Sequence, residues 1–235
     1  MTERTDPASS RVEIPADLPE PIHQRDYEVL VYDIGEGKML LRGRLEDFRT
    51  QGLIEGDPEP ITIHEMVVEM VVDSATFEIL LCRAKMRTHP HSYCPEIEDR
   101  YEELEGLSIA RGFTHKVREL LGGPKGCSHV TMLIQAMAPV AIQAGFSVRM
   151  KVAERMTGDV EITPEVERGV RRMMLEANRG TCHYFADDGP AFEAFERGEE
   201  WTPPLWALER MGKLGIDAEE FTKIWRRRPG PGDAG

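Results

Sequence analysis

Thiol and imidazole side chains recur in three short stretches of the chain. These stretches are HPHSYC (His89, His91, Cys94), GCSH (Cys127, His129) and TCHYF (Cys182, His183). Thiolates and imidazoles are borderline-soft donors that zinc and iron bind at about 2.0–2.3 Å. Because the stretches fall between expected secondary-structure elements and can converge, the sequence predicts a zinc or iron site. Its predicted ligands are Cys94, Cys127 and His129, with Cys182, His183 and His91 as further candidates.

The same residues also fit a thiol enzyme without metal. Cys127 follows the loop GGPKG and precedes an apolar run, and Cys94 precedes Pro95, so we expect both thiols at helix N-termini. The helix macrodipole and the free N–H groups stabilise a thiolate there. In this alternative Cys127 or Cys94 is the catalytic nucleophile, with His129 or His91 as its base.

The GGPKG loop also bears a weak likeness to a phosphate cradle, with Lys125 and Gly126 as cofactor-binding residues. Glycine-rich loops bind phosphates through backbone N–H groups and a lysine ammonium. The full G-x-x-x-x-G-K-[ST] pattern is absent from the chain, so residue type and loop composition carry this interpretation.

Alternating apolar residues predict the strands that precede these loops. The stretches YEVLVYDI and KMLLRGRLEDF are joined by GEG, and ITIHEMVVEMVVD runs through SAT into FEILLCRAKMRT. A three-residue turn at 74–76 would place Met70 opposite Leu80 and Val68 opposite Cys82 on one face. Cys82 is then a core residue, and His64 on the same strand face is interpreted as a core histidine.

Helical periodicity follows the strands. The stretches CPEIEDRYEEL, SIARGFTHKVRELLGG, SHVTMLIQAMAPVAIQAGF and TPEVERGVRRMMLEANRG each carry an apolar stripe, and Pro139 should kink or divide the third. We therefore expect an α+β fold, in which an antiparallel sheet of about four strands is covered on one face by helices, with a helical C-terminal tail. The expected segments are a flexible 1–25, a core domain 26–185, a helical extension 186–228 and a disordered tail 229–235.

Composition limits the classes of function. The net charge of −13 over 235 residues opposes binding to nucleic acid or to anionic membranes. The N-terminal segment has no apolar stretch typical of a signal peptide, and we expect a cytoplasmic protein with reduced cysteines. All 3 tryptophans lie in the last 50 residues or so. The aromatic tail therefore favours a further alternative, a non-catalytic accessory subunit that binds a protein partner, whereas an active site would take a small-molecule substrate.

The order of the motifs LRGRLEDFR, CPEIEDRYEELEGLSIARGF, VRELLGGPKGCSHVTMLI and TCHYFADDGP resembles a bacterial family known as domain of unknown function 2889. The resemblance covers roughly residues 38–190 and implies one bacterial domain without an established activity. The layout is also similar to iron–sulfur scaffold proteins of the NifU/SufE type. That similarity implies clustered cysteines, with Cys94 and Cys127 matching the later two and no cysteine at the position of the first.

Overall fold

The fold is that of a computed structural model, which describes residues 16–110, 112–157, 163–199, 204–217 and 219–220. The chain divides into two compact units, residues 1–149 and 150–235, and each is described by itself. The division falls inside the segment 26–185 that we expected to form one core domain.

The first unit contains one antiparallel sheet of four strands in the order β1-β2-β3-β4. The strands are β1 (Gln24–Gly35), β2 (Lys38–Arg49), β3 (Ile61–Asp73) and β4 (Ile79–Thr88). Neighbours in the chain are neighbours in the sheet because each connection is a hairpin. The prediction of an α+β fold with a four-stranded antiparallel sheet is confirmed.

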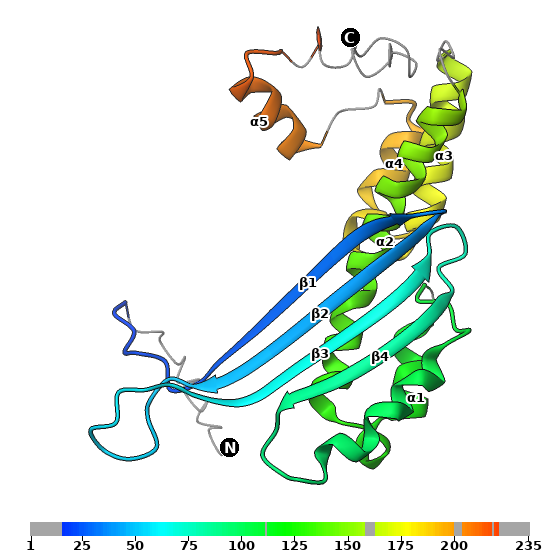
Figure 1. Cartoon of the computed structure of the whole chain (residues 1–235). Helices are drawn as coiled ribbons and strands as arrows, with labels where there is room; N and C mark the ends of the chain where they lie inside the picture. The colour runs from blue at the N-terminus through cyan, green and yellow to red at the C-terminus, as the bar shows by residue number, and fades with distance from the viewer. Residues whose placement is uncertain (1–15, 111, 158–162, 200–203, 218, 221–235) are drawn as a thin grey trace, which may run out of the picture. The chain divides into compact units, whose positions relative to one another are not determined.

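Helices cover one face of this sheet, and Figure 1 shows α1 and α2 behind it. The elements are η1 (Cys94–Leu104), α1 (Phe113–Leu121), η2 (Gly123–Lys125) and α2 (Ser128–Thr157). The stretch CPEIEDRYEEL forms a 3₁₀ helix with a proline in its first turn. Tyr101 and Leu104 of that helix are fully buried, as their predicted stripe requires.

The hydrophobic core lies between the inner face of the sheet and these helices. Its fully buried residues include Leu41 and Leu45 of β2 and Leu133 and Met137 of α2. At Gly43 the helix α2 comes close to the sheet, because a Cβ there would lie 2.5 Å from the sulfur of Met137. The absence of a side chain at this position therefore lets α2 lie directly on β2.

The β3–β4 register differs from the prediction by two residues. Met70 lies opposite Cys82 and Val68 opposite Ala84. The connection is longer than three residues because Phe77 also belongs to it, with a positive φ of 60°, and a bulge follows Val71. A shift of two residues keeps each side chain on its face, so Cys82 is buried as predicted. Leu80 is 42% exposed, because the bulge turns it outward.

The helix α2 passes through Pro139 without interruption, so the proline does not divide it. By length and mean hydropathy, residues 128–148 qualify as a candidate membrane span, which the sequence analysis did not detect. Part of this segment packs into the core of the first unit, with Val130, Leu133 and Ile134 fully buried, while Met132 and Phe146 are exposed. That burial is typical of the central helix of a soluble domain.

The second unit contains the end of α2 and the elements that follow it. These are α3 (Pro164–Asn178), η3 (His183–Phe185), α4 (Pro190–Glu196) and α5 (Leu205–Lys213). Leu175, Ala191 and Phe192 form a small core of their own. Trp206 is 74% exposed within α5, while Trp201 and Trp225 lie outside the described residues.

Candidate metal centre

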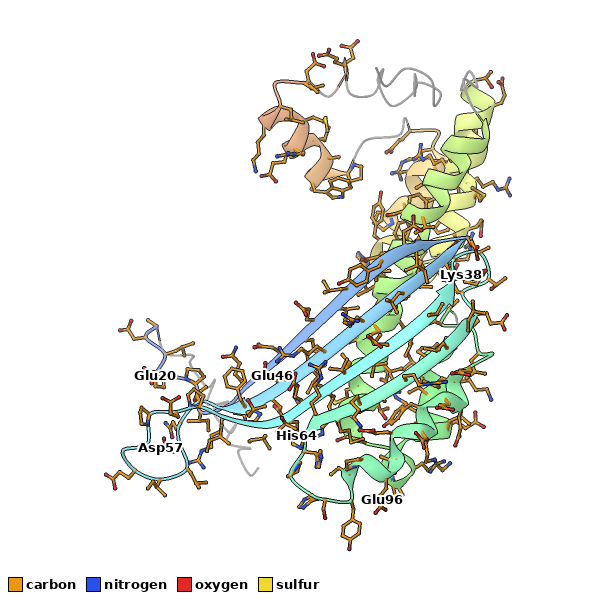
Figure 2. The ribbon with its side chains drawn as sticks, viewed as in Figure 1. Glu20, Lys38, Glu46, Asp57, His64 and Glu96 are labelled. Atoms are coloured by element: carbon orange, nitrogen blue, oxygen red, sulfur yellow. The ribbon has the colours of Figure 1, made fainter. Side chains whose placement is uncertain are left out.

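Polar residues on three neighbouring strands form the last row of side chains on the inner face of the sheet. Arg25 of β1 lies opposite Asp47 of β2, and Asp47 lies opposite His64 of β3. The adjacent inner-face positions on β2 and β3 are Leu45 and Met66, both buried and apolar. Figure 2 shows His64 toward one end of the sheet, with Lys38 at the other. The site therefore forms where the apolar core stops.

Asp47 is the centre of this group and is 98% removed from solvent, with 2% relative exposure. Its Oδ1 accepts hydrogen bonds from Arg25 Nε at 3.2 Å and lies 2.5 Å from His23 Nε2. Its Oδ2 accepts a hydrogen bond from Arg25 Nη2 at 2.7 Å and lies 3.1 Å from His64 Nδ1. The Nε2 atom of His129, in the first turn of α2, lies 3.5 Å from the same Oδ2.

The electrostatics favour the ionised form of Asp47 and the neutral form of His129. Burial alone would raise the pKa of Asp47, but hydrogen bonds from Arg25, His23 and His64 outweigh it, and the pKa lies well below its usual range. Burial lowers the pKa of His129, and the nearby His64 and Arg25 lower it further despite the opposing effect of Asp47. A neutral imidazole beside a carboxylate is the form that binds a metal or accepts a proton.

The spacing of three of these groups fits one metal ion. Asp47, His64 and His129 each offer one ligand atom, and these atoms lie within 4.8 Å of one another. When bonds to a metal are about 2.0–2.2 Å, neighbouring ligand atoms are roughly 3.0–3.6 Å apart. The distances of 3.1 and 3.5 Å from Oδ2 to the two imidazole nitrogens match that range. The two imidazoles are stacked with ring centroids 3.7 Å apart, and each has one nitrogen atom facing Oδ2 of Asp47.

The other nitrogen of His129 faces a thiol. Cys127 Sγ lies 3.7 Å from His129 Nδ1. The side chain of Tyr101 holds Cys127 in place, because its hydroxyl accepts from the Cys127 N–H at 2.8 Å and donates to the Cys127 carbonyl at 3.2 Å. His129 therefore connects the thiol of Cys127 to the carboxylate of Asp47.

We expect Tyr101→Phe to lower the free energy of unfolding by about 1–3 kcal/mol, because the part-buried N–H of Cys127 loses its acceptor. The same change should make Cys127 less ordered relative to His129. Chemical denaturation measures the first effect, and the NMR linewidth of the Cys127 amide measures the second. A variant with wild-type stability and an unchanged Cys127 resonance would contradict this role for the hydroxyl.

The structure does not bring the predicted site residues together into one group. Of the predicted ligands, His129 alone belongs to the one group of three ligands found among the described residues. Cys94 begins η1 and is partly buried against the core, and His91 accepts through its carbonyl from the Cys94 N–H. Cys182 is exposed in the second unit, and His183 begins η3 there.

The expected phosphate-binding pair has structural contacts in the loop. Lys125 Nζ donates to the carbonyl of Glu119 at 2.8 Å, near the end of α1. A Cβ at Gly126 would lie 2.5 Å from the carbonyl oxygen of Leu121, so the close approach of the two backbones requires glycine there. Both contacts fix the loop that leads to Cys127.

Asp47, Arg25 and His23 were not among the predicted site residues, and His64 was interpreted as a core histidine. The alternation of buried and exposed positions along the strands contains a signal for Asp47 and His64. Asp47 continues the buried series of β2 two residues after Leu45, where an acidic residue breaks an otherwise apolar face. His64 continues the buried face of β3 in the same way. No local pattern indicates His23, which precedes the sheet.

Comparison with known proteins identifies a family for just over half of the chain. A family model described as "Protein of unknown function (DUF2889)" matches residues 23–143. The match spans the sheet, the first helices and the start of α2, and it therefore includes His23, Asp47, His64 and His129. No curated protein and no solved structure matches the chain.

Proposed function

The chain belongs to the DUF2889 family of proteins of unknown function, and from the site itself we propose that it binds a divalent transition metal, zinc or iron. The observation that supports this proposal is the meeting of Asp47, His64 and His129 at the spacing of metal ligands. Two imidazoles with one carboxylate form a donor set that suits zinc and non-haem iron(II) better than calcium or magnesium, which prefer oxygen ligands.

Three protein ligands leave at least one coordination position free on either metal. Catalytic zinc sites and the iron(II) sites of two histidines and one carboxylate share that feature, whereas structural zinc sites are closed by four protein ligands. The proposed centre can therefore activate water or polarise a substrate oxygen as a Lewis acid. A small-molecule substrate would reach it at the end of the sheet, where His23 and Arg25 are partly exposed.

Metal titration tests this proposal. Protein purified without a His-tag should bind roughly one equivalent of zinc or iron(II), and His64→Ala should weaken binding by more than about 100-fold, since even outer-shell partners contribute 10–100-fold. His115→Ala is the matched control, because His115 is exposed on α1, away from the group. Elemental analysis and competition with a chelating indicator give stoichiometry and affinity. Equal affinities for wild type and His64→Ala would overturn the proposed site.

A second candidate function is thiol chemistry at Cys127. The line from Cys127 Sγ through both nitrogens of His129 to Asp47 supports it, since the same order of groups activates the nucleophile in cysteine enzymes. Cys127 also lies directly before the first turn of α2. A reactive, alkylatable Cys127 in metal-free protein would favour this function.

The remaining expectations stay predictions. The bacterial origin, the cytoplasmic location and a protein partner are such predictions; for the partner, the exposed Trp206 of α5 is the described residue that could take part. Similarity to iron–sulfur scaffolds predicts iron together with acid-labile sulfide. The elemental analysis described above separates that outcome from a mononuclear ion if sulfide is measured in the same samples.

A further inference from the structure

His23 contacts the carboxylate of Asp47, as do the two histidines of the group, His64 and His129. Its Nε2 lies 2.5 Å from Asp47 Oδ1, while His64 and His129 approach Oδ2. The side chain of His23 is 46% exposed, compared with 16% for His64 and 18% for His129. The inner-face ligands are thus enclosed by the sheet and α2, and His23 lies on the side that is open to solvent.

The neighbours of Asp47 leave few candidates for a fourth ligand. Arg25 has no acceptor atom and stays protonated, so it cannot bind a metal ion. Cys127 lies beside Nδ1 of His129, on the ring edge away from Nε2 and Asp47. Among the described side chains that contact the carboxylate, His23 is the remaining one with a lone pair for a metal.

We propose that His23 is a fourth, solvent-side ligand of this metal centre, and that metal binding thereby fixes the segment before β1 onto the sheet. The inference rests on the proposed function. His23 Nε2 contacts Oδ1 of Asp47 but lies outside the group whose ligand atoms are within 4.8 Å of one another, so ligation at Oδ2 requires the imidazole and the segment before β1 to move toward the metal. Three histidines and one carboxylate would close a tetrahedral zinc site, so with His23 bound the open positions for Lewis-acid chemistry are those of an octahedral iron(II) ion, which keeps two.

The segment that His23 would fix has few other contacts. Residues 16–23 are exposed, and the hydroxyl of Thr50 donates to the carbonyl of Pro21. Figure 2 shows Glu20 in this segment at the same end of the sheet as Glu46. One metal bond from His23 would therefore change the order of the segment measurably, because little else holds it.

His23→Gln in the full-length protein tests the inference. Glutamine keeps an N–H donor for Asp47 but is a poor ligand for zinc, so the variant separates ligation from the hydrogen bond. We expect zinc affinity to fall by at least about tenfold, the scale on which even outer-shell partners act. Zinc should slow hydrogen–deuterium exchange across residues 16–23 in the wild type and not in His23→Gln. His115→Gln is the control and should match the wild type in both measurements.

The outcomes separate this inference from the proposed function. If the wild type binds zinc through His64 but His23→Gln has the same affinity and the same zinc-dependent protection, His23 is not a ligand and the three-residue site stands. If the wild type binds neither zinc nor iron(II), both proposals are overturned. Cobalt(II) gives an independent readout, because the intensity of its visible absorption should change in His23→Gln when a nitrogen ligand is lost.

Discussion

Asp47→Asn is expected to lower the free energy of unfolding of the metal-free protein by about 3 kcal/mol at pH 7, the cost of breaking a buried ion pair by removing one partner. The carboxylate is buried and binds the guanidinium of Arg25 through both oxygens. An amide of the same size presents one acceptor where two are used, and it leaves the positive charge of Arg25 without a counter-ion. Urea denaturation of the two proteins measures the difference.

The size of this effect should depend on pH in a defined direction. The pKa of Asp47 in the folded protein lies below its ordinary value, which is about 3.9 in an unfolded chain. The carboxylate therefore stabilises the fold above about pH 4, and this contribution is lost as pH falls below that value toward the lowered pKa. The difference in free energy of unfolding between wild type and Asp47→Asn should be largest at pH 7 and smaller at pH 3.

Glu69→Gln is the matched control for the buried pair. Glu69 pairs with Arg42 at 2.7 Å on the same sheet, but both side chains are substantially exposed. Exposed pairs contribute about 0–1 kcal/mol, so this variant should stay within 1 kcal/mol of the wild type. If Asp47→Asn proves as mild as Glu69→Gln, or if its cost is equally large at pH 3, the buried ion pair is not what stabilises this end of the sheet.

Local periodicity was sufficient to predict the elements of the first unit. Alternation identified the strands, and the stripe containing Tyr101 and Leu104 identified the helix that follows them. The register of β3 and β4 was wrong by two residues because a positive φ at Phe77 and a bulge after Val71 lengthen the connection. Such backbone irregularities depend on tertiary contacts and leave little trace in an alternating pattern.

The site was predicted in part, because its residues converge through pairings that are far apart in the sequence. His129 was recognised from its spacing to Cys127. Asp47 and His64 become neighbours only through the register of β2 and β3, and each alone looks like an ordinary residue of a strand. Arg25 and His23 lie in the segment that we expected to be flexible, although β1 already begins at Gln24. A charged residue on a buried strand face was the available signal, and cross-strand alignment was needed to use it.

His129→Ala and His64→Ala should separate the two candidate functions, because His129 has a role in both and His64 in one. Both variants lose metal affinity in our proposal. In metal-free protein, His129→Ala should slow alkylation of Cys127 by iodoacetamide roughly 100-fold, the lower scale of general-base catalysis, since the thiol loses its proton acceptor at Nδ1. His64→Ala leaves that nitrogen in place and should react like the wild type. Mass spectrometry quantifies the modified Cys127 peptide, and the exposed Cys182 serves as an internal reference.

Zinc should suppress the same alkylation in the wild type, because one imidazole cannot serve both functions at once. A metal bound to Nε2 of His129 leaves the proton of the neutral ring on Nδ1, where it faces Cys127 Sγ as a donor. The ring then cannot accept the thiol proton, and Cys127 becomes an outer-shell partner of the metal. Zinc should have no effect on the thiol in His64→Ala at concentrations that this variant does not bind. Alkylation that is insensitive to both zinc and His129→Ala would show that the contact between Cys127 and His129 carries no chemistry.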